Sequence, residues 1–439
     1  MEPLNIALLG CGTVGGGTAQ ILTEMKPVLT ERAAREINLK KIVEIQPEEA
    51  VKRFDLPMEL FCGNGKSLTK EESNQFIDEI LQDPEINMVI ETIGGSNDWI
   101  ENLAIKTLKA KKHLITANKA LLAERGNNIF KHAVENKVVV GFEAAVCGAI
   151  PIIKTINESF SGDEVISLSG IMNGTSNYIL SKMQNEGLDF ETVLKMAQDN
   201  GYAEADPTLD INGGDAGHKI CILMKLAFGV DISMNQLSVQ GIENITQEEI
   251  DFAKEIDSKI KLICYAKKEN NKIYTTVQPM MVKNNNMLAE INGATNAVRV
   301  ENKYSGMQVL IGSGAGSTET ASSIVADIIY IARYAEQIPK KFIKTNLQPI
   351  DPDKFTFSYL IIFDTEDIPG ITGMVTTCIG NQNINIDTVS HNRHNIDKAV
   401  FSIATMPCSK EQISMAIQQI KKQKPDILLR EPRIIPILY

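Results

Sequence analysis

The sequence predicts an α/β protein built from three successive units. Residues 4–9 form a short apolar run, LNIALL, which ends in the glycine-rich turn GCGTVG at 10–15, and an amphipathic stretch follows. Residues 259–300 contain several runs typical of strands, and residues 356–439 follow a βαββαβ order. A chain of 439 residues is too long for one ordinary core, so two or three domains are expected.

Composition and charge narrow the classes of partner. The net charge of −11 and the pI near 5.2 argue against nucleic acid and anionic membrane surfaces. The seven cysteines lack zinc-ligand spacing and no HExxH pair occurs, so we expect reduced thiols and no catalytic zinc. No basic leader is present and no apolar run reaches about 18 residues. A cytoplasmic protein without a membrane partner is expected.

The first unit carries the signature of a Rossmann-type dinucleotide-binding domain. In the order strand, GxGxxG and helix, Gly10 and Gly12 allow a tight turn close to a pyrophosphate, and Gly15 lets the helix pack on the strand. A second strand is expected at 39–45, with Glu44 near its end. A carboxylate there suits the ribose of NAD and repels the extra phosphate of NADP, whereas a solvent-facing acid without a ligand is an equal alternative.

The remainder of this unit continues the pattern of strand and helix. Further strands are expected at 86–93, 113–117 and 137–146, with a helix at 98–109. Gly94, at the end of the first of these strands, allows a backbone to approach a ligand. Lys119 follows the second strand and would lie on the ligand side of a doubly wound sheet, while a plain surface lysine is the alternative.

The stretch GYAEADPTLDINGGDAGHK at 201–219 concentrates charges at the start of an apolar helix. Asp215 and Lys219 have i, i+4 spacing, so they share one helix face. An exposed salt bridge is the simple interpretation. The run at 220–228 is apolar except for Lys225, which places this helix in a core and favours Lys219 as a proton-transfer group beside carboxylates.

The residues around this stretch predict a strand and turn within 160–178 and a helix at 189–199. Strands at 260–266, 272–282, 287–293 and 296–302 would form a sheet beneath it. The glycine loop GSGAG at 312–316 then precedes a helix at 318–334, whose N-terminus is expected to return to the cofactor phosphates.

With these elements placed, the chain resembles the long bacterial form of homoserine dehydrogenase, which has a C-terminal ACT domain. The resemblance covers nearly the whole length. It is carried by the motifs GCGTVG (10–15), ETIGG (91–95), TANK (116–119), EAAVCGAIP (143–151), GIMNGTSNYIL (170–180), GYAEADPTLDINGGDAGHK (201–219), GSGAG (312–316) and DIPG (367–370).

The resemblance implies an oxidoreductase that interconverts L-homoserine and L-aspartate 4-semialdehyde with NAD or NADP, in threonine, methionine and isoleucine biosynthesis. Lys219 matches the acid/base lysine of the family, and Asp215 matches a catalytic carboxylate. Lys119 matches a second active-site lysine that contacts cofactor and substrate. Glu204 matches the residue that binds the amino end of the substrate.

The resemblance also implies cofactor and cation sites. Positions that touch the nucleotide are Thr13, Val14, Thr92, Lys119 and Gly316, besides the glycines and Glu44 named above. A monovalent cation, Na or K, would be held largely by backbone carbonyls at Glu143, Val146, Gly148 and Ile150.

The implied domain division is a Rossmann domain at 1–142 completed by 305–335, an α+β catalytic and dimerisation domain at 143–304, a linker at 336–355 and an ACT domain at 356–439. A homodimer or homotetramer is expected. An amino-acid effector would bind the ACT domain, but the loop sequence His391-Asn392-Arg393-His394 means that threonine cannot be assumed.

Two other functions stay open at this point. Another NAD(P)-dependent amino-acid semialdehyde oxidoreductase would share the nucleotide motifs without a reason for GYAEADP. A non-catalytic sensor of nucleotides and amino acids would keep GCGTVG and the ACT segment, but would not need Lys119, Glu204, Asp215 and Lys219 together.

Overall fold

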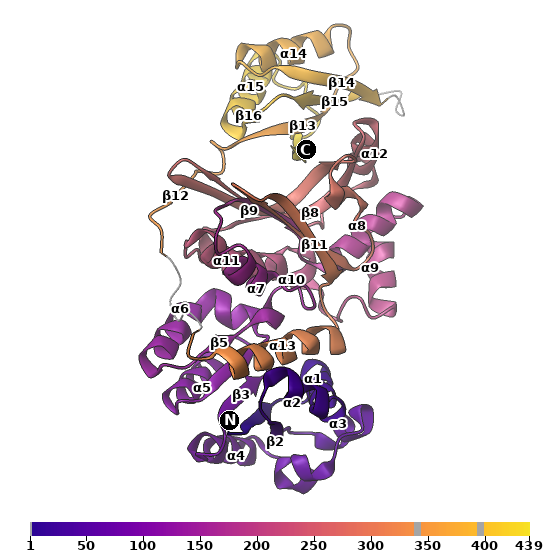
Figure 1. Ribbon diagram of the computed structural model, residues 1–439. Coiled ribbons are helices and arrows are strands. Elements are labelled where there is room, and N and C mark those ends of the chain that lie inside the picture. The colour runs from indigo at the N-terminus through magenta and orange to yellow at the C-terminus, as the bar shows by residue number, and fades with distance from the viewer. Residues whose placement is uncertain (1, 338–343, 393–398) are drawn as a thin grey trace.

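The computed structural model describes residues 2–337, 344–392 and 399–439, arranged as three units stacked along one axis (Figure 1). The N-terminal unit lies at one end, a middle unit follows, and the C-terminal unit lies at the other end. Across these ranges, no helix is long and apolar enough to cross a membrane.

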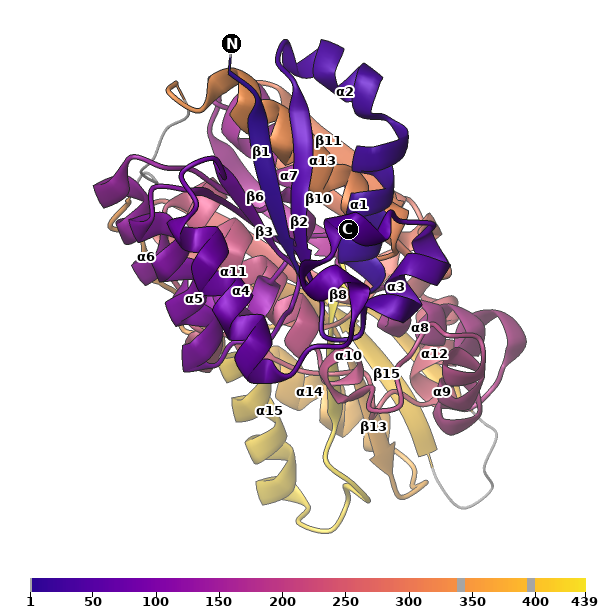
Figure 2. The same ribbon diagram turned by 90° about the horizontal axis from the view of Figure 1, so that it is seen from below.

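The N-terminal unit is a parallel sheet in the order β2-β1-β3-β4-β5. Helices cover both faces: α1, α2, α3 and α13 on one and α4, α5 and α6 on the other (Figure 2). The strands are β1 (Leu4–Leu9), β2 (Ile37–Val43), β3 (Met88–Glu91), β4 (His113–Thr116) and β5 (Val140–Gly141), and the helices are α1 (Thr13–Glu24), α2 (Lys26–Ala33), α3 (Pro47–Phe54), α4 (Lys70–Gln82), α5 (Asp98–Lys109), α6 (Lys119–Asn136) and α13 (Thr318–Tyr334). This is the predicted doubly wound arrangement, and its ligand edge lies at the carboxyl ends of the strands.

The predicted strand at 137–146 was largely wrong, because β5 contains only two residues and a 3-10 turn, η3 (Glu143–Ala145), follows it. The Glu143 N–H donates to Oδ2 of Asp327 on α13 at 2.9 Å, and the Ala145 N–H donates to the Phe142 carbonyl at 3.0 Å. These bonds turn the chain out of the sheet and towards the middle unit.

The middle unit is built on an antiparallel sheet in the order β11-β10-β6-β8-β9. Helix α11 (Gly214–Phe228) lies between this sheet and the N-terminal unit, since it packs on β8 and on α6. The other elements are β6 (Val165–Ile171), β7 (Ser238–Val239), β8 (Ser258–Glu269), β9 (Lys272–Lys283), β10 (Thr295–Asn302), β11 (Gly306–Ser313), α7 (Ile152–Lys154), α8 (Gly174–Glu186), α9 (Phe190–Asp199), α10 (Thr208–Ile211) and α12 (Gln247–Glu255).

Three predictions for this unit need correction. Residues 174–186 form α8, which the sequence analysis did not predict, and Asn173 caps it. The strand expected at 287–293 is the 3-10 turn η6 (Met287–Glu290), because the Asn286 side chain accepts the Leu288 N–H and starts a turn. Of residues 305–335, only α13 completes the Rossmann domain; β11 pairs with β10 and belongs to the middle sheet.

The C-terminal unit has the predicted βαββαβ order, with its sheet arranged β17-β13-β15-β14. Its elements are β13 (Thr356–Thr365), α14 (Ile371–Asn381), β14 (Ile386–Asn392), β15 (Ala399–Thr405), β16 (Cys408–Ser409), α15 (Lys410–Gln423) and β17 (Arg433–Leu438). Strand β17 pairs in parallel with β9 through Ile437 and Leu438, so the middle and C-terminal sheets are continuous.

The expected linker at 336–355 is partly attached to the middle sheet. Within it, β12 (Gln348–Pro349) pairs with β9, while residues 338–343 lie outside the described residues. The prediction of a loop at His391 was also wrong, since His391 lies within β14 opposite Phe401. Arg393 and His394 fall outside the described residues.

Lys261 on β8 is a fully buried lysine whose ammonium faces only uncharged oxygens. Its Nζ contacts the Ile291 carbonyl at 2.5 Å and Oδ1 of Asn177 at 3.1 Å. Burial, reinforced by the charge of Lys259 and opposed by Glu290, lowers the pKa of Lys261 to about 7. Between that pH and its ordinary pKa of 10.5, the unfolded chain binds the extra proton, so stability rises with pH across this window.

We expect Lys261→Met to remove this pH dependence. The free energy of unfolding of the wild type should gain up to about 1.4 kcal/mol per pH unit relative to the variant between pH 7 and 10. Urea unfolding across this range measures the slope. Lys267→Met on the same strand, which breaks an exposed pair with Glu269, should keep the wild-type slope. Parallel curves for Lys261→Met and wild type would contradict the assignment.

Candidate active site

The glycine turn after β1 has the close packing that a nucleotide-binding loop requires. Gly10 has φ +86°, and a Cβ on Gly15 would lie 2.2 Å from the Gly10 carbonyl oxygen. The Thr92 hydroxyl donates to that same carbonyl at 2.8 Å. In contrast, apart from Gly12 itself and its neighbours in the chain, no described atom lies within 4 Å of its Cβ position, so its outer face is open to a ligand. Thr13 and Val14 follow in the first turn of α1, whose N–H groups face the same side.

Glu44 lies directly after β2 and contacts the glycine turn. Its Oε2 accepts the Cys11 N–H at 2.6 Å, and its Oε1 accepts the Gln46 N–H at 3.1 Å. The carboxylate is therefore held beside the loop, which is the position expected for a ribose-binding acid, and it is not a free surface charge. An ionised carboxylate has about four acceptor sites, so it can still accept bonds from a sugar.

The buried carboxylate of Glu91 organises the loop that follows β3. One oxygen accepts the N–H groups of Ile93 and Gly94, both at 2.8 Å, and the other accepts the Thr116 hydroxyl at 2.6 Å. Asn118 then donates to the Gly95 carbonyl at 2.5 Å and caps α6. These bonds fix the backbone of the adjacent Lys119, the first residue of α6, at the ligand edge of the sheet.

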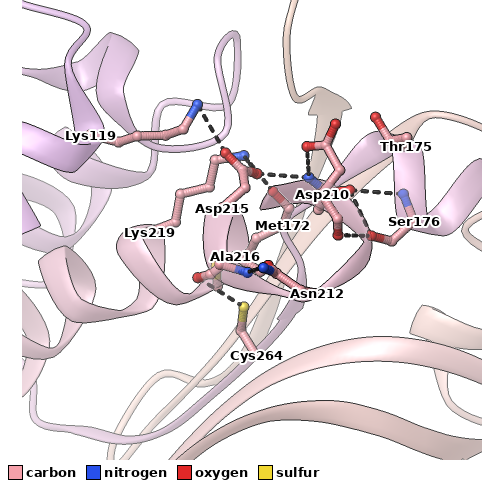
Figure 3. A network of polar contacts seen from close by, with 12 residues as sticks. Lys119, Met172, Thr175, Ser176, Asp210, Asn212, Asp215, Ala216, Lys219 and Cys264 are labelled. Atoms are coloured by element: carbon pink, nitrogen blue, oxygen red, sulfur yellow. Dashed lines mark hydrogen bonds and ion pairs between the residues drawn. The ribbon is translucent and has the colours of Figure 1, made fainter. Parts of the chain in front are cut away.

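Lys119 and Lys219 both contact Asp215, from two sides (Figure 3). The Lys219 ammonium lies 2.7 Å from Oδ2 of Asp215 and donates to the Met172 carbonyl at 2.6 Å. The Lys119 ammonium lies 2.9 Å from Oδ1. The predicted i, i+4 pair on α11 is thus confirmed, and α6 of the N-terminal unit supplies the third charge.

Burial and charge act in opposite directions on this cluster. Asp215 and Lys219 are 5% and 6% exposed, so Lys219 is not a surface salt-bridge partner. Burial alone would raise the pKa of Asp215, but the Lys219 and Lys119 ammoniums outweigh it and lower that pKa well below its usual range. Burial alone would lower the pKa of Lys219, but the Asp215 carboxylate outweighs it and raises that pKa. At neutral pH the cluster holds a carboxylate and an ammonium.

Two residues beyond the predicted site belong to this cluster. Asn173 donates to Asp215 at 2.8 Å and to Asp210 at 2.7 Å. Burial raises the pKa of Asp210, although the Asn173 bond opposes this. The sequence signal for Asn173 was the GIMNG turn after a strand, and the signal for Asp210 was a further carboxylate close to the start of the apolar helix. Conversely, Glu204 lies exposed between α9 and α10, and within the described residues no bond joins its side chain to Lys219 or Asp215.

The chain that follows the loop at 312–316 contacts the glycine turn, while the predicted approach to the cofactor phosphates stays a prediction. The Ser317 hydroxyl donates to the Thr13 carbonyl at 2.7 Å. Gly316 has φ +149°, and a Cβ there would lie 2.2 Å from a carboxylate oxygen of Glu319. Gly148 packs closely against Gly314, because a Cβ added at Gly148 would lie 2.8 Å from the Gly314 backbone. The chain passes between the N-terminal and middle units near Gly148 and again near Gly314. These two connecting segments therefore lie together beside the glycine turn.

The four residues predicted to hold a monovalent cation lie in the first of these connecting segments, between β5 and α7. The Glu143 carboxylate is occupied, since it accepts the N–H groups of Ile153 at 2.7 Å and Lys154 at 2.9 Å. The carbonyls of Gly148 and Ile150 each accept one hydrogen bond, which leaves a second lone pair on each oxygen. The described residues contain no group of three acidic, histidine or cysteine side chains suited to a metal.

A cavity of about 540 Å³ lies at the other end of α11 and has a mainly apolar lining that includes Phe130, Phe142 and Leu226. It contains none of Lys119, Asp215 and Lys219. The volume of this cavity does not make it the candidate active site, because the cluster of charged side chains and the open glycine turn lie elsewhere.

Comparison with known proteins agrees with this geometry. Residues 151–329 match the family model of homoserine dehydrogenase, and residues 10–143 match the model of its NAD binding domain. The homoserine dehydrogenases of Neisseria gonorrhoeae and Helicobacter pylori are 37% and 34% identical over 98% of this chain, which spans 99% and 98% of theirs. The crystal structure of a homoserine dehydrogenase from Thiobacillus denitrificans superposes with a TM-score of 0.90 at 33% identity, covering 100% of this chain and 98% of that chain. The chain therefore belongs to the homoserine dehydrogenase family.

Proposed function

We propose that this chain interconverts L-homoserine and L-aspartate 4-semialdehyde with NAD or NADP, as part of threonine, methionine and isoleucine biosynthesis. The observation that carries the proposal is the buried Lys219–Asp215 pair, with Lys119 across from it, where the nucleotide-binding unit meets α11. A carbonyl reduction needs a hydride for the carbonyl carbon and a proton for the carbonyl oxygen, and Lys219 at this boundary is our candidate for the proton donor.

The residues at the ligand edge fit a dinucleotide. Gly10 and Gly15 leave no room for side chains, Gly12 is open, and the start of α1 offers N–H groups to phosphates. Glu44 and Thr92 bond to the glycine turn, and Gly316 precedes Ser317, which bonds to Thr13. These three residues and Gly94, which follows β3, are assigned to cofactor binding. When bound, the nicotinamide supplies hydride to the aldehyde carbon or takes it from the alcohol.

Lys219 is assigned as the general acid in the reducing direction. Its raised pKa keeps it protonated at neutral pH, so it can give a proton to the developing alkoxide. Asp215 holds the ammonium at 2.7 Å. The Lys119 side chain is 42% exposed and its ammonium contacts Oδ1 of Asp215, which suits polarisation of the substrate oxygen or contact with its carboxylate.

The remaining substrate and cation assignments are also part of the proposal. Glu204 is assigned to the ammonium of the amino acid, from the exposed loop that follows α9. The carbonyls at Glu143, Val146, Gly148 and Ile150 would hold a sodium or potassium ion and so order the crossing between the units.

The C-terminal unit is proposed to be an ACT-type ligand-binding domain with an amino-acid effector. The βαββαβ order and the DIPG turn before α14 support it. We also propose a homodimer or homotetramer with contacts on the β10–β11 side of the middle sheet, where Met307 and Ile311 are 49% and 51% exposed.

The position of Glu44 favours NAD over NADP, and its replacement tests this preference. We expect Glu44→Arg to raise the ratio of kcat/KM for NADP+ to that for NAD+ by at least about tenfold, because a basic side chain there would meet the extra phosphate. Glu48→Arg makes the same charge change on the exposed start of α3 and should leave the ratio unchanged. A Glu44→Arg enzyme with the wild-type ratio would show that Glu44 does not face the ribose.

Initial rates test the function as a whole. Oxidation of homoserine, serine and threonine should be followed by reduced-cofactor absorbance with NAD+ and NADP+, each with and without added threonine as effector. Homoserine-dependent turnover well above the other alcohols supports the proposal. Faster turnover of another hydroxy-amino acid would indicate a different oxidoreductase, and no turnover with any of them would indicate a sensor.

A further inference from the structure

Asn173 stands at the junction of β6 and α8, and both its amide oxygen and its amide hydrogens are hydrogen-bonded. Its Oδ1 accepts the Ser176 N–H at 2.8 Å and so caps α8, while the single hydroxyl hydrogen of Ser176 lies between this oxygen, at 2.8 Å, and the Asp210 carbonyl, at 2.7 Å. Its Nδ2 donates one hydrogen to Oδ1 of Asp210 and the other to Oδ2 of Asp215. A flipped amide would place its oxygen against two carboxylates, so only this orientation is compatible with the surroundings.

Two consecutive residues therefore hold both members of the catalytic pair. The Met172 carbonyl accepts the Lys219 ammonium at 2.6 Å, and the Asn173 amide donates to Asp215 at 2.8 Å. Asn173 is only 5% exposed. Because β6 lies inside the middle sheet between β10 and β8, this junction is a rigid support for the pair.

The Asn173 amide also bridges two carboxylates, those of Asp210 and Asp215. Asp210 on α10 and Asp215 on α11 each accept from the same NH2 group, and the charge of Asp215 disfavours ionisation of Asp210. An N–H donor favours the ionised form of a carboxylate, so one amide supports both charges. An ionised Asp215 is in turn what keeps Lys219 protonated.

We propose that Asn173 is a positioning residue for the reaction, whose amide clamps Asp210 and Asp215 and so holds Asp215 at hydrogen-bond distance from Lys219. This inference rests on the proposed role of Lys219. It adds a residue that touches neither hydride carrier nor substrate oxygen and acts through Asp215.

Two substitutions separate the clamp from the helix cap. Asn173→Asp keeps an oxygen that can cap α8, but it replaces the NH2 donor with a carboxylate oxygen facing two acids. Asn173→Ser also retains a good capping group, adds no charge and loses the reach to Asp210 and Asp215. We expect both variants to lower kcat at least about tenfold per cofactor-binding site, with the dissociation constant for NADH unchanged.

The pH profile distinguishes positioning from a loss of folded protein. In Asn173→Asp, the added negative charge should move the ionisation of Lys219, seen in kcat against pH, upwards by about one pH unit or more, while Asn173→Ser should show a smaller displacement. Asp189→Ala removes the cap of the neighbouring helix α9, without contact to the cluster, and should leave both kcat and the profile at wild-type values.

Wild-type kcat per NADH-binding site in Asn173→Asp and Asn173→Ser, or an unshifted profile in Asn173→Asp, would overturn the inference. If the Asn173 variants give such a result while Lys219→Ala is inactive in the same assay, only the proposed role of Asn173 is refuted. A fully active Lys219→Ala would instead remove the proposed chemistry on which the inference depends.

Discussion

Lys219→Ala should lower kcat for homoserine oxidation by a factor of about 10²–10⁴, the usual contribution of a positioned acid or base. The side chain bonds to Asp215 and the Met172 carbonyl, and among the described residues it has no bond to the glycine turn, so cofactor binding should be retained. Steady-state rates and fluorescence titration with NADH measure the two effects separately.

Lys225→Ala is the matched control for this experiment. Lys225 lies on the same helix, but it pairs with Asp231 and Asn127 at the far end, and within the described part of the chain it makes no hydrogen bond or ion pair with the cluster. Its loss should leave kcat close to the wild-type value. Near-normal turnover in Lys219→Ala would refute the assignment of the proton donor.

Asp215→Asn is expected to have the second large effect. It removes the carboxylate that both ammoniums share, which is the main influence opposing burial, so the pKa of Lys219 should fall. The limb of kcat against pH that reports Lys219 should move to lower pH, and kcat should drop. Breaking a buried pair costs about 3–5 kcal/mol, which denaturant unfolding can measure.

The pH range of this stabilisation follows from the two directions of shift. Asp215 has a lowered pKa, so its contribution is full above its ordinary value of 3.8 and is lost as pH falls through the folded-state pKa. Lys219 has a raised pKa, so its contribution is full below its ordinary 10.5 and is lost as pH rises through the folded-state pKa. Asp231→Asn, which breaks a pair whose carboxylate is half exposed, should cost less than about 1 kcal/mol. An Asp215→Asn enzyme with the wild-type pH profile would contradict this account.

Local patterns were sufficient for the parts of the fold and site that depend on neighbours in sequence. The turn at 10–15 is specified by adjacent glycines, and the Asp215–Lys219 pair by helical spacing, and both predictions are confirmed. The helices at 98–109 and 318–334 were likewise predicted at their observed bounds, because their apolar positions repeat with the helical period.

Contacts between distant segments could not be read in the same way. Asn173 and Asp215 are 42 residues apart, and tertiary packing, in which α10 contacts both α8 and α11, brings the amide to the carboxylate. The run at 137–146 has strand composition, yet the bond from the Glu143 N–H to Asp327 on α13 ends the strand early. In both places a tertiary partner determined the local structure, and propensity alone does not contain it.

The pairing of β17 with β9 has a consequence for synthesis of the chain on the ribosome. Met281 and its partner Ile437 are separated by roughly 150 residues, which at typical translation rates take on the order of 10–30 s to add. During that interval this part of β9 presents unpaired N–H and C=O groups at a sheet edge, a template on which other chains can add. Occupancy of this edge by a chaperone or a neighbouring nascent chain would therefore compete with folding of the C-terminal unit. Slower translation lengthens the competition.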